Sequence, residues 1–169
     1  MGEFIARERL QPALLDRLTD TAPEQTREAA DQQTLSMVQL RAAVLRDLTW
    51  LLNTTDLATS EDLDAFPLAA ASGLNFGIPG FTGLIGTHQA LARLEAAIAA
   101  AIRNFEPRIR PDTLSVRARP AAAGQPMPAV VFEISGELWA QPVPQRLFLE
   151  TAIELETRRA VVTEARGRG

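Results

Sequence analysis

Glutamates are the residues of this chain that are best suited to chemistry. A glycosidase needs two carboxylates across a sugar ring, one of them with its pKa raised by burial. The candidates for such a pair are Glu106, Glu133, Glu137, Glu150 and Glu154. All but Glu106 fall on the polar faces of predicted strands, where side chains are normally solvated. Glu106 lies two residues before Arg108, and a nearby guanidinium favours the ionised carboxylate over the protonated acid.

A glycosidase is nevertheless the alternative function that these glutamates leave open, and other kinds of chemistry are restricted further. The chain has no Cys and one histidine, His88, so a thiolate or His-based metal site and a Ser-His-Asp triad are very hard to build. The glycine-rich stretch at residues 70–87 lacks both phosphate-loop patterns, and the chain has no Lys to meet a phosphate. We interpret that stretch as a packed apolar loop. No catalytic residue, metal or cofactor is expected.

The sequence RNFEPRIRP, residues 103–111, places a carboxylate, a proline and a guanidinium at the end of a predicted helix. Pro107 explains the helix end, because it has no N–H to donate and moves Glu106 out of the helical region. Glu106 and Arg108 then present an acceptor and a planar five-donor fork on a rigid corner. We expect this corner to bind a charged surface of another protein. Arg108 is expected to be exposed, so that Arg108→Ala leaves the fold intact.

Composition indicates one globular domain. The chain has 169 residues, 46% of them hydrophobic and 22% charged, and its mean hydropathy is −0.02. The formal net charge is −4, and all 17 basic residues are Arg spread along the chain, which argues against a nucleic-acid surface. No signal-peptide pattern opens the chain, and no apolar run approaches the roughly 20 residues that span a bilayer. A cytoplasmic protein without direct membrane insertion is expected.

Four regions are predicted along the chain. Residues 1–20 form an amphipathic helix, residues 21–33 a polar flexible linker, residues 34–165 a single domain and residues 166–169 a frayed tail. A short helix on such a linker is not stable alone, so it folds back on the domain or docks on another protein. The residues expected to bind a partner there are Leu14, Leu15, Arg17 and Leu18.

The domain is predicted to be α+β, with N-terminal helices, a long central helix and then a small antiparallel sheet. Apolar residues recur at helical spacing over residues 34–52 and 87–105, and the period changes to two after Pro111. The strand in LFLETAIELE, or the segment after it, is expected at the sheet edge, where unpaired backbone groups accept a strand from another chain. The edge residues are then Leu147, Leu149, Thr151, Ile153 and Leu155.

Five blocks, in this order and spacing, resemble the TssE family of type VI secretion baseplate subunits, a relative of the phage-tail baseplate wedge proteins long labelled lysozyme-like. They are LQPALLDRLTD, QLRAAVLRDLTWLLNTT, SGLNFGIPGF, ALARLEAAIAAAIRNFEPRI and FEISGELWAQPVPQRLFLETAIELETRRAVV. The resemblance implies a non-enzymatic structural protein whose domain is similar to the handle of a contractile sheath protein.

The same resemblance implies the partners. Glu106, Pro107 and Arg108 match the triplet that is the family's signature, which is associated with docking onto the TssF/TssG core bundle of the wedge. The strands are expected to template the first sheath ring by strand exchange with TssB/TssC. TssK and the VgrG hub are further candidate neighbours, and the subunit is expected to be recruited from the cytoplasm to the baseplate at the inner membrane.

Overall fold

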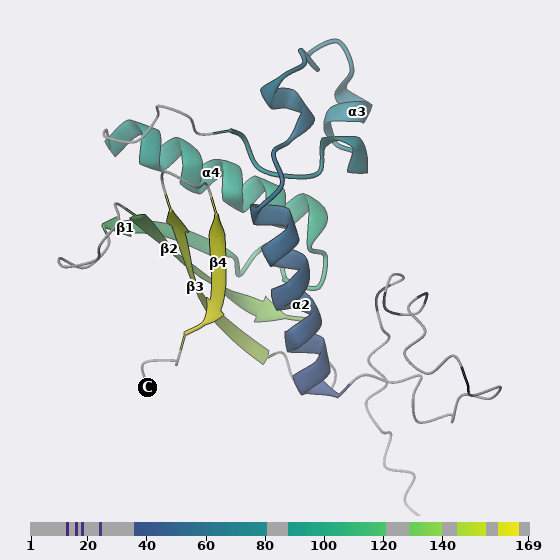
Figure 1. The fold of residues 1–169 in the computed structure, drawn as a ribbon, viewed down its shortest axis with the longest axis vertical. Helices are drawn as coiled ribbons and strands as arrows, with labels where there is room; N and C mark the ends of the chain where they lie inside the picture. The colour runs from purple at the N-terminus through teal and green to yellow at the C-terminus, as the bar shows by residue number, and fades with distance from the viewer. Residues whose placement is uncertain are drawn as a thin grey trace, which may run out of the picture.

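The computed structural model describes residues 36–80, 88–120, 129–139, 145–154 and 159–165, together with Ala13, Asp16, Leu18 and Glu24. Helices come first and strands follow, so the α+β prediction is confirmed (Figure 1). The elements are α2 (Met37–Leu52), the 3-10 turn η2 (Leu57–Thr59), α3 (Pro67–Ala70), the 3-10 turn η3 (Gly73–Asn75), α4 (His88–Phe105), β1 (Ser115–Pro120), β2 (Ala129–Leu138), β3 (Gln145–Glu154) and β4 (Ala160–Glu164). The predicted helix at 1–20 and linker at 21–33 lie almost wholly outside the described residues.

Helix α2 begins where its sequence provides a cap. The side chain of Ser36 accepts from the N–H of Gln39 at 3.3 Å, and the side chain of Gln39 accepts from the N–H of Ser36 at 2.9 Å. This reciprocal pair satisfies two N–H groups that a helix start leaves unpaired. The helix therefore begins at Met37, later than the predicted start at Thr34.

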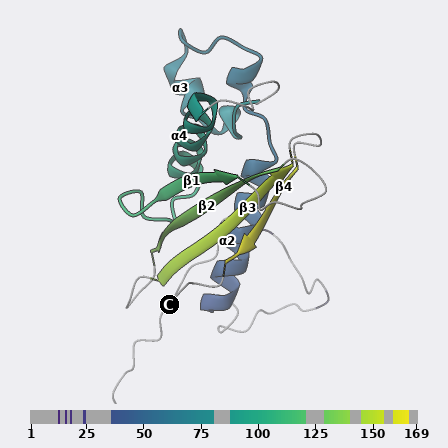
Figure 2. The same cartoon turned by 90° about the vertical axis from the view of Figure 1, so that its left-hand side faces the viewer.

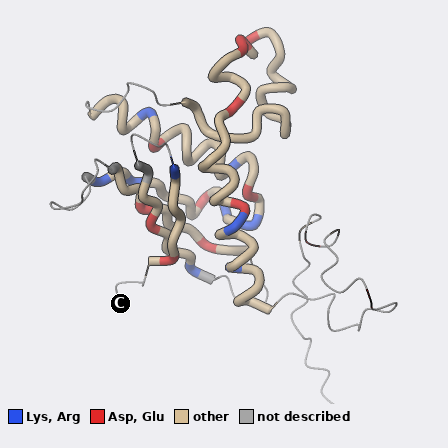
Figure 3. Tube along the Cα trace, in the orientation of Figure 1, with Lys and Arg blue, Asp and Glu red and all other residues tan. Residues whose placement is uncertain are grey.

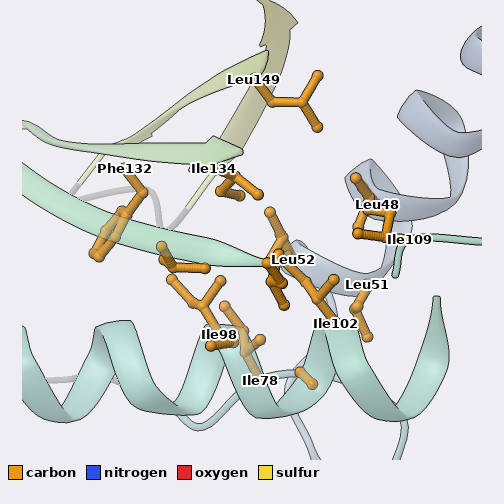
Figure 4. Close-up of a cluster of buried hydrophobic side chains, with 14 of the residues drawn as sticks. Leu48, Leu51, Leu52, Ile78, Ile98, Ile102, Ile109, Phe132, Ile134 and Leu149 are labelled. Atoms are coloured by element: carbon orange, nitrogen blue, oxygen red, sulfur yellow. The ribbon is translucent and has the colours of Figure 1, made fainter. Parts of the chain in front are cut away.

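The core lies between the sheet and the two long helices (Figures 1 and 2). Apolar residues of α2 and α4 repeat every three or four positions, so each helix buries one face against the sheet. Figure 4 shows these side chains converging on the inner face of the strands. The side chains with at most 2% exposure include Leu48, Leu51, Leu52, Ile98, Ile102, Phe132, Ile134, Leu138, Leu147 and Leu149.

The strands form one antiparallel sheet in the order β1-β2-β3-β4. The prediction that β3 is the edge strand is therefore wrong: β3 pairs with β2 on one side and β4 on the other. Leu147, Leu149 and Thr151 are buried, Ile153 continues the strand, and Leu155 lies outside the described residues. The alternative, the segment after β3, is confirmed as an edge. Alternation shows which face of a strand is buried but contains no information on strand order.

The β4 edge is capped at one end by helix α2. The side chain of Asn53 accepts from the N–H of Ala160 at 3.0 Å and donates to its carbonyl at 2.9 Å. Ala165 donates to the carbonyl of Phe148 in β3, so the alternation of an antiparallel ladder turns the backbone groups of Val162 and Glu164 away from β3. Within the described residues, the backbone of these two residues is bonded neither to β3 nor to Asn53, while the side chain of Glu164 is paired with Arg41 of α2.

The β1 edge is protected in a similar way. The carboxylate of Glu95 in α4 accepts from the N–H of Ala118 at 2.7 Å. Pro120, two residues further along the same side of the strand, has no N–H to offer. Side chains and proline thus close much of this edge to a foreign strand, which is how natural sheets limit edge-to-edge pairing.

Candidate functional site

Glu106, Pro107 and Arg108 form a tight corner at the end of α4. The N–H of Glu106 donates to the carbonyl of Ile102 at 2.8 Å, which is the last bond of the helical pattern before the proline. The N–H of Ile109 then donates to the carbonyl of Glu106 at 3.1 Å and closes a turn. Pro107 is exposed on the outside of this turn. The predicted role of the proline in ending the helix is consistent with this geometry.

The residues after the corner are bonded to the end of β2. Ile109 and Leu138 form an antiparallel bridge, in which Arg110 donates to the carbonyl of Glu137 at 2.9 Å and Trp139 donates to the carbonyl of Arg108 at 2.7 Å. A Cβ added to Gly136 would lie 2.9 Å from Cγ2 of Ile109, so the glycine makes room for the buried isoleucine. The backbone of the corner is thereby fixed on both sides.

Glu106 and Arg108 bind each other rather than the solvent. Glu106 is only 2% exposed. Its Oε1 accepts from the backbone N–H of Arg108 at 3.1 Å and from Nε of the guanidinium at 2.6 Å, while Nη2 donates to Oε2. This two-pronged contact is the geometry in which a guanidinium binds a carboxylate most strongly. The buried carboxylate is therefore neutralised by its neighbour two residues on.

The corner is also tied to α2 by a series of alternating charges. Nη2 of Arg108 donates to Oδ2 of Asp47 at 2.5 Å, and Oδ1 of Asp47 accepts from Nε of Arg46 at 2.8 Å. Nη1 of Arg46 in turn donates to Oδ1 of Asp16 at 2.5 Å. We call the five residues Glu106, Arg108, Asp47, Arg46 and Asp16 the charge network. It connects the N-terminal segment, α2 and the end of α4.

The charge network keeps both of its guanidinium groups ionised. Burial lowers the pKa of Arg108, but the hydrogen bonds and negative charges of Glu106 and Asp47 outweigh it and raise the pKa above its ordinary value. The pKa of Arg46 is also raised, chiefly by its hydrogen bond to Asp16. Since Arg titrates far above neutral pH in any case, the network carries its two positive charges throughout the physiological range.

The expectation that Arg108 is exposed is wrong. Its side chain is 19% exposed, and its Nη1 is a buried donor without a hydrogen-bond partner in the described structure. The physical reason is the carboxylate of Asp47, 61 residues earlier in the chain, which needs a cation and which the guanidinium reaches when α2 and α4 pack together. Within the described residues, Glu106 and Arg108 bind each other, and Arg108 also binds Asp47 of α2. The outer surface of the corner is formed by neighbouring residues.

The other candidate residues lie in the N-terminal segment and on the sheet. Leu18 has helical backbone and is 73% exposed, whereas Leu14, Leu15 and Arg17 lie outside the described residues. The candidate glutamates of the sheet are paired with arginines: Arg119 contacts Glu133 at 3.1 Å and Glu150 at 2.8 Å. Arg110 contacts Glu137 at 3.4 Å. Glu154 is described in its backbone alone.

Sequence reasoning missed Asp47, Arg46 and Asp16 as members of this site. The sequence offered one indication: Asp47 directly precedes Leu48, at the border of the buried face of its helix. A carboxylate at the border of a buried helix face needs a cation, and the sequence offers many arginines without indicating which one is near.

Comparison with known families identifies the group to which the chain is related. The family model for baseplate wedge protein gp25 matches residues 38–143, which is more than half of the chain and includes the corner. The chain belongs to the gp25 family of baseplate wedge proteins. The resemblance to baseplate wedge proteins that the sequence blocks indicate is thus confirmed.

Further comparisons of this gp25-family chain are more distant. No curated protein matches it. Among solved structures, a chain of "The baseplate complex from the type VI secretion system" is similar, with 15% sequence identity and a TM-score of 0.45. The similarity covers 77% of this chain and 97% of that chain.

None of the helices described is both long and apolar enough to cross a bilayer. Among the described side chains, no group of three or more His, Cys, Asp or Glu is arranged to hold a metal ion.

Replacing Arg108 by Ala is expected to lower the free energy of unfolding by about 2–4 kcal/mol, because it leaves the buried carboxylate of Glu106 and the charge of Asp47 without their cation. Urea denaturation measures this change. Arg110→Ala is the matched control, because its pairs with Asp112 and Glu137 lie at the surface, where water screens them and they contribute little to stability. Equal, small effects for the two variants would show that the charge network does not stabilise the fold.

Proposed function

We propose that this chain is the TssE-type subunit of a type VI secretion baseplate, a structural component that joins the wedge to the contractile sheath. The observation that supports this most strongly is membership of the baseplate wedge family over residues 38–143, together with the five sequence blocks. The family is defined by a structural part of a tail-like machine. The domain that carries this role is proposed to span residues 34–165.

The proposed contact with the TssF/TssG core bundle is made by the outer surface of the corner. The charge network uses both carboxylate oxygens of Glu106, and Nε and Nη2 of Arg108, internally, so its role is to hold the shape of the corner. Pro107 and Asn104 are exposed beside it, and Trp139, whose N–H donates to the carbonyl of Arg108, is 63% exposed. Exposed aromatic side chains on a rigid backbone are the most effective anchors at protein interfaces.

The N-terminal segment is a second proposed contact, through Leu14, Leu15, Arg17 and Leu18. What supports it is the ion pair between Asp16 and Arg46, which holds this part of the segment against α2 while Leu18 stays exposed. A segment attached at Asp16 can offer its apolar residues to a partner without losing its connection to the domain.

The proposed contact with the TssB/TssC sheath is strand exchange at the β4 edge rather than at β3. The backbone groups of Val162 and Glu164 face away from β3, and Asn53 caps the neighbouring Ala160. Strand addition there extends the four-stranded sheet by one strand. From the resemblance we also infer that TssK and the VgrG hub are neighbours, and that the subunit is cytoplasmic and recruited to the baseplate at the inner membrane.

The subunit is proposed to have no enzymatic activity. A lysozyme-like mechanism requires a carboxylic acid that is free to protonate a glycosidic oxygen. Both oxygens of Glu106 instead accept hydrogen bonds from Arg108. Clearance of purified peptidoglycan by the isolated protein, abolished by Glu106→Gln, would contradict this part of the proposal.

Asn104→Arg is expected to reduce co-purification with TssF and TssG at least fivefold. The substitution places a long side chain over the exposed side of the corner, and it suits a helix C-terminus because the cation complements the helix dipole. The fold is therefore retained, as circular dichroism will show. Ala96→Arg, about 12 Å earlier on the same helix and also exposed, is the control. Unchanged recovery of TssF and TssG with Asn104→Arg would refute docking at the corner.

Hydrogen exchange tests the β4 edge. In the free protein the amides of Val162 and Glu164 are expected to exchange faster than those of Val161 and Thr163, which bond to β3. Addition of TssB and TssC is expected to slow the exchange of Val162 and Glu164 at least tenfold, because an added strand provides acceptors for both. If their exchange rates stay the same while the sheath proteins bind, strand exchange takes place elsewhere.

A further inference from the structure

The connection between α2 and α4 folds into a small unit that projects from the core, which we call the acidic lobe (residues 56–76; Figure 1). It contains η2, α3 and η3, and none of these three elements has a buried residue. The interpretation of the glycine-rich part of this region as a packed apolar loop is therefore wrong for Leu74, which is 73% exposed, although Ile78 just beyond the lobe is buried.

Polar contacts hold the acidic lobe in shape. Asp56 caps η2 by accepting from the N–H of Thr59 at 3.0 Å and from its hydroxyl at 2.6 Å. The side chain of Asn75 accepts from the N–H of Ala58 at 2.9 Å and donates to the carbonyl of Ala70 at 3.0 Å, so it ties η2, α3 and η3 together. The lobe thus has a defined shape without a hydrophobic core of its own.

The base of the acidic lobe is equally constrained. Ile78 donates to the carbonyl of Thr54 at 2.9 Å and accepts from the N–H of Asp56 at 3.1 Å. Next to it, Gly77 has a φ of 138°, and a Cβ there would lie 2.6 Å from the carbonyl oxygen of Thr54. Only glycine suits this position. The lobe is therefore attached to the domain as a rigid projection.

Large apolar side chains on the lobe face the solvent. Phe66 is 61% exposed, Leu68 87% and Leu74 73%, and the helical turns at which they lie, α3 and η3, pack side by side. These side chains stay exposed when the lobe folds. The free protein therefore keeps their apolar surface in contact with water, which is unfavourable. Three large exposed apolar residues within nine residues of one rigid unit are a candidate interaction surface.

The charge of the lobe restricts what can cover this surface. Asp56, Glu61, Asp62 and Asp64 lie within it, and the sequence has no Arg or Lys between Arg46 and Arg93 (Figure 3). An anionic membrane would be repelled by such a surface. Two copies of the lobe would repel each other as well, which disfavours a symmetric dimer through this face.

We propose that the acidic lobe is a docking platform for a basic amphipathic helix of another protein. Apolar side chains of that helix contact Phe66, Leu68 and Leu74, while Arg or Lys residues flanking its apolar stripe pair with Glu61, Asp62 and Asp64. This contact is separate from the corner and from the β4 edge, so it provides the subunit with a further partner or a further hold on a known one.

A photo-crosslinking amino acid at Leu68, in the full chain expressed in its native cells, tests the proposal. The expected product joins the lobe to a helix of another protein that has apolar residues flanked by Arg or Lys within one or two turns. Val38 in α2, which is 77% exposed, is the control position for the crosslinker and should not give this product.

Two variants test whether both the apolar and the acidic side chains of the lobe bind the partner helix. Leu74→Ser should reduce the crosslink yield at least tenfold. The triple variant Glu61→Gln, Asp62→Asn, Asp64→Asn should reduce it at least fivefold; the change Asp62→Asn keeps the side-chain oxygen that accepts from the N–H of residue 64. Crosslinks confined to a second copy or to lipid, a target segment without basic residues, or an unchanged yield in either variant would overturn the proposal. Recovery of TssF and TssG is measured separately, so a failure here leaves the docking of the corner untouched.

Discussion

The structure depends on the neutralisation of one buried carboxylate. Glu106 is 2% exposed, and an ionised carboxylate in that position without a partner would cost several kcal/mol. Arg108 provides the partner at a separation of two residues, which is short enough for both to belong to one turn. Because the same guanidinium also reaches Asp47, the complete set of contacts forms only when α2 and the end of α4 are packed together. Local turn geometry and tertiary packing are thus coupled through a single side chain.

This coupling changes how the triplet Glu106, Pro107 and Arg108 is understood. A charged motif on a helix end suggests direct binding of a partner, whereas here the charges are used within the domain itself. If the corner binds the proposed partner, substitutions of Arg108 weaken that binding by loosening the corner, without any contact between the guanidinium and the partner. The outer surface, with Pro107, Asn104 and Trp139, is the part left to make contacts. The acidic lobe is joined to the same region, because Phe76 just beyond η3 packs edge-on against Phe105 at 5.3 Å.

Much of the fold could be predicted from the sequence because it is local. The leucines of α2, the apolar stripe of α4 and the alternation in β1, β2 and β3 follow from periodicity alone, and Pro107 is sufficient to end α4. The order of the strands is not local, so the prediction of β3 as an edge is wrong. Likewise, Asp47 and Arg108 are far apart in the sequence, and no spacing rule connects them. The prediction for Leu74 fails because an apolar residue in a glycine-rich loop is expected to be buried, whereas much of the surface of a folded protein is apolar.

A double-mutant cycle between Asp47 and Arg108 measures how strongly the end of α4 is coupled to α2. It isolates their interaction from the separate effects of Asp47→Ala and Arg108→Ala on the free energy of unfolding, measured by urea denaturation. We expect a coupling energy above about 1 kcal/mol, because the pair is partly buried and Nη2 of Arg108 lies 2.5 Å from Oδ2 of Asp47. Additive effects, with a coupling energy below about 0.3 kcal/mol, would contradict the claim that this ion pair couples the corner to α2.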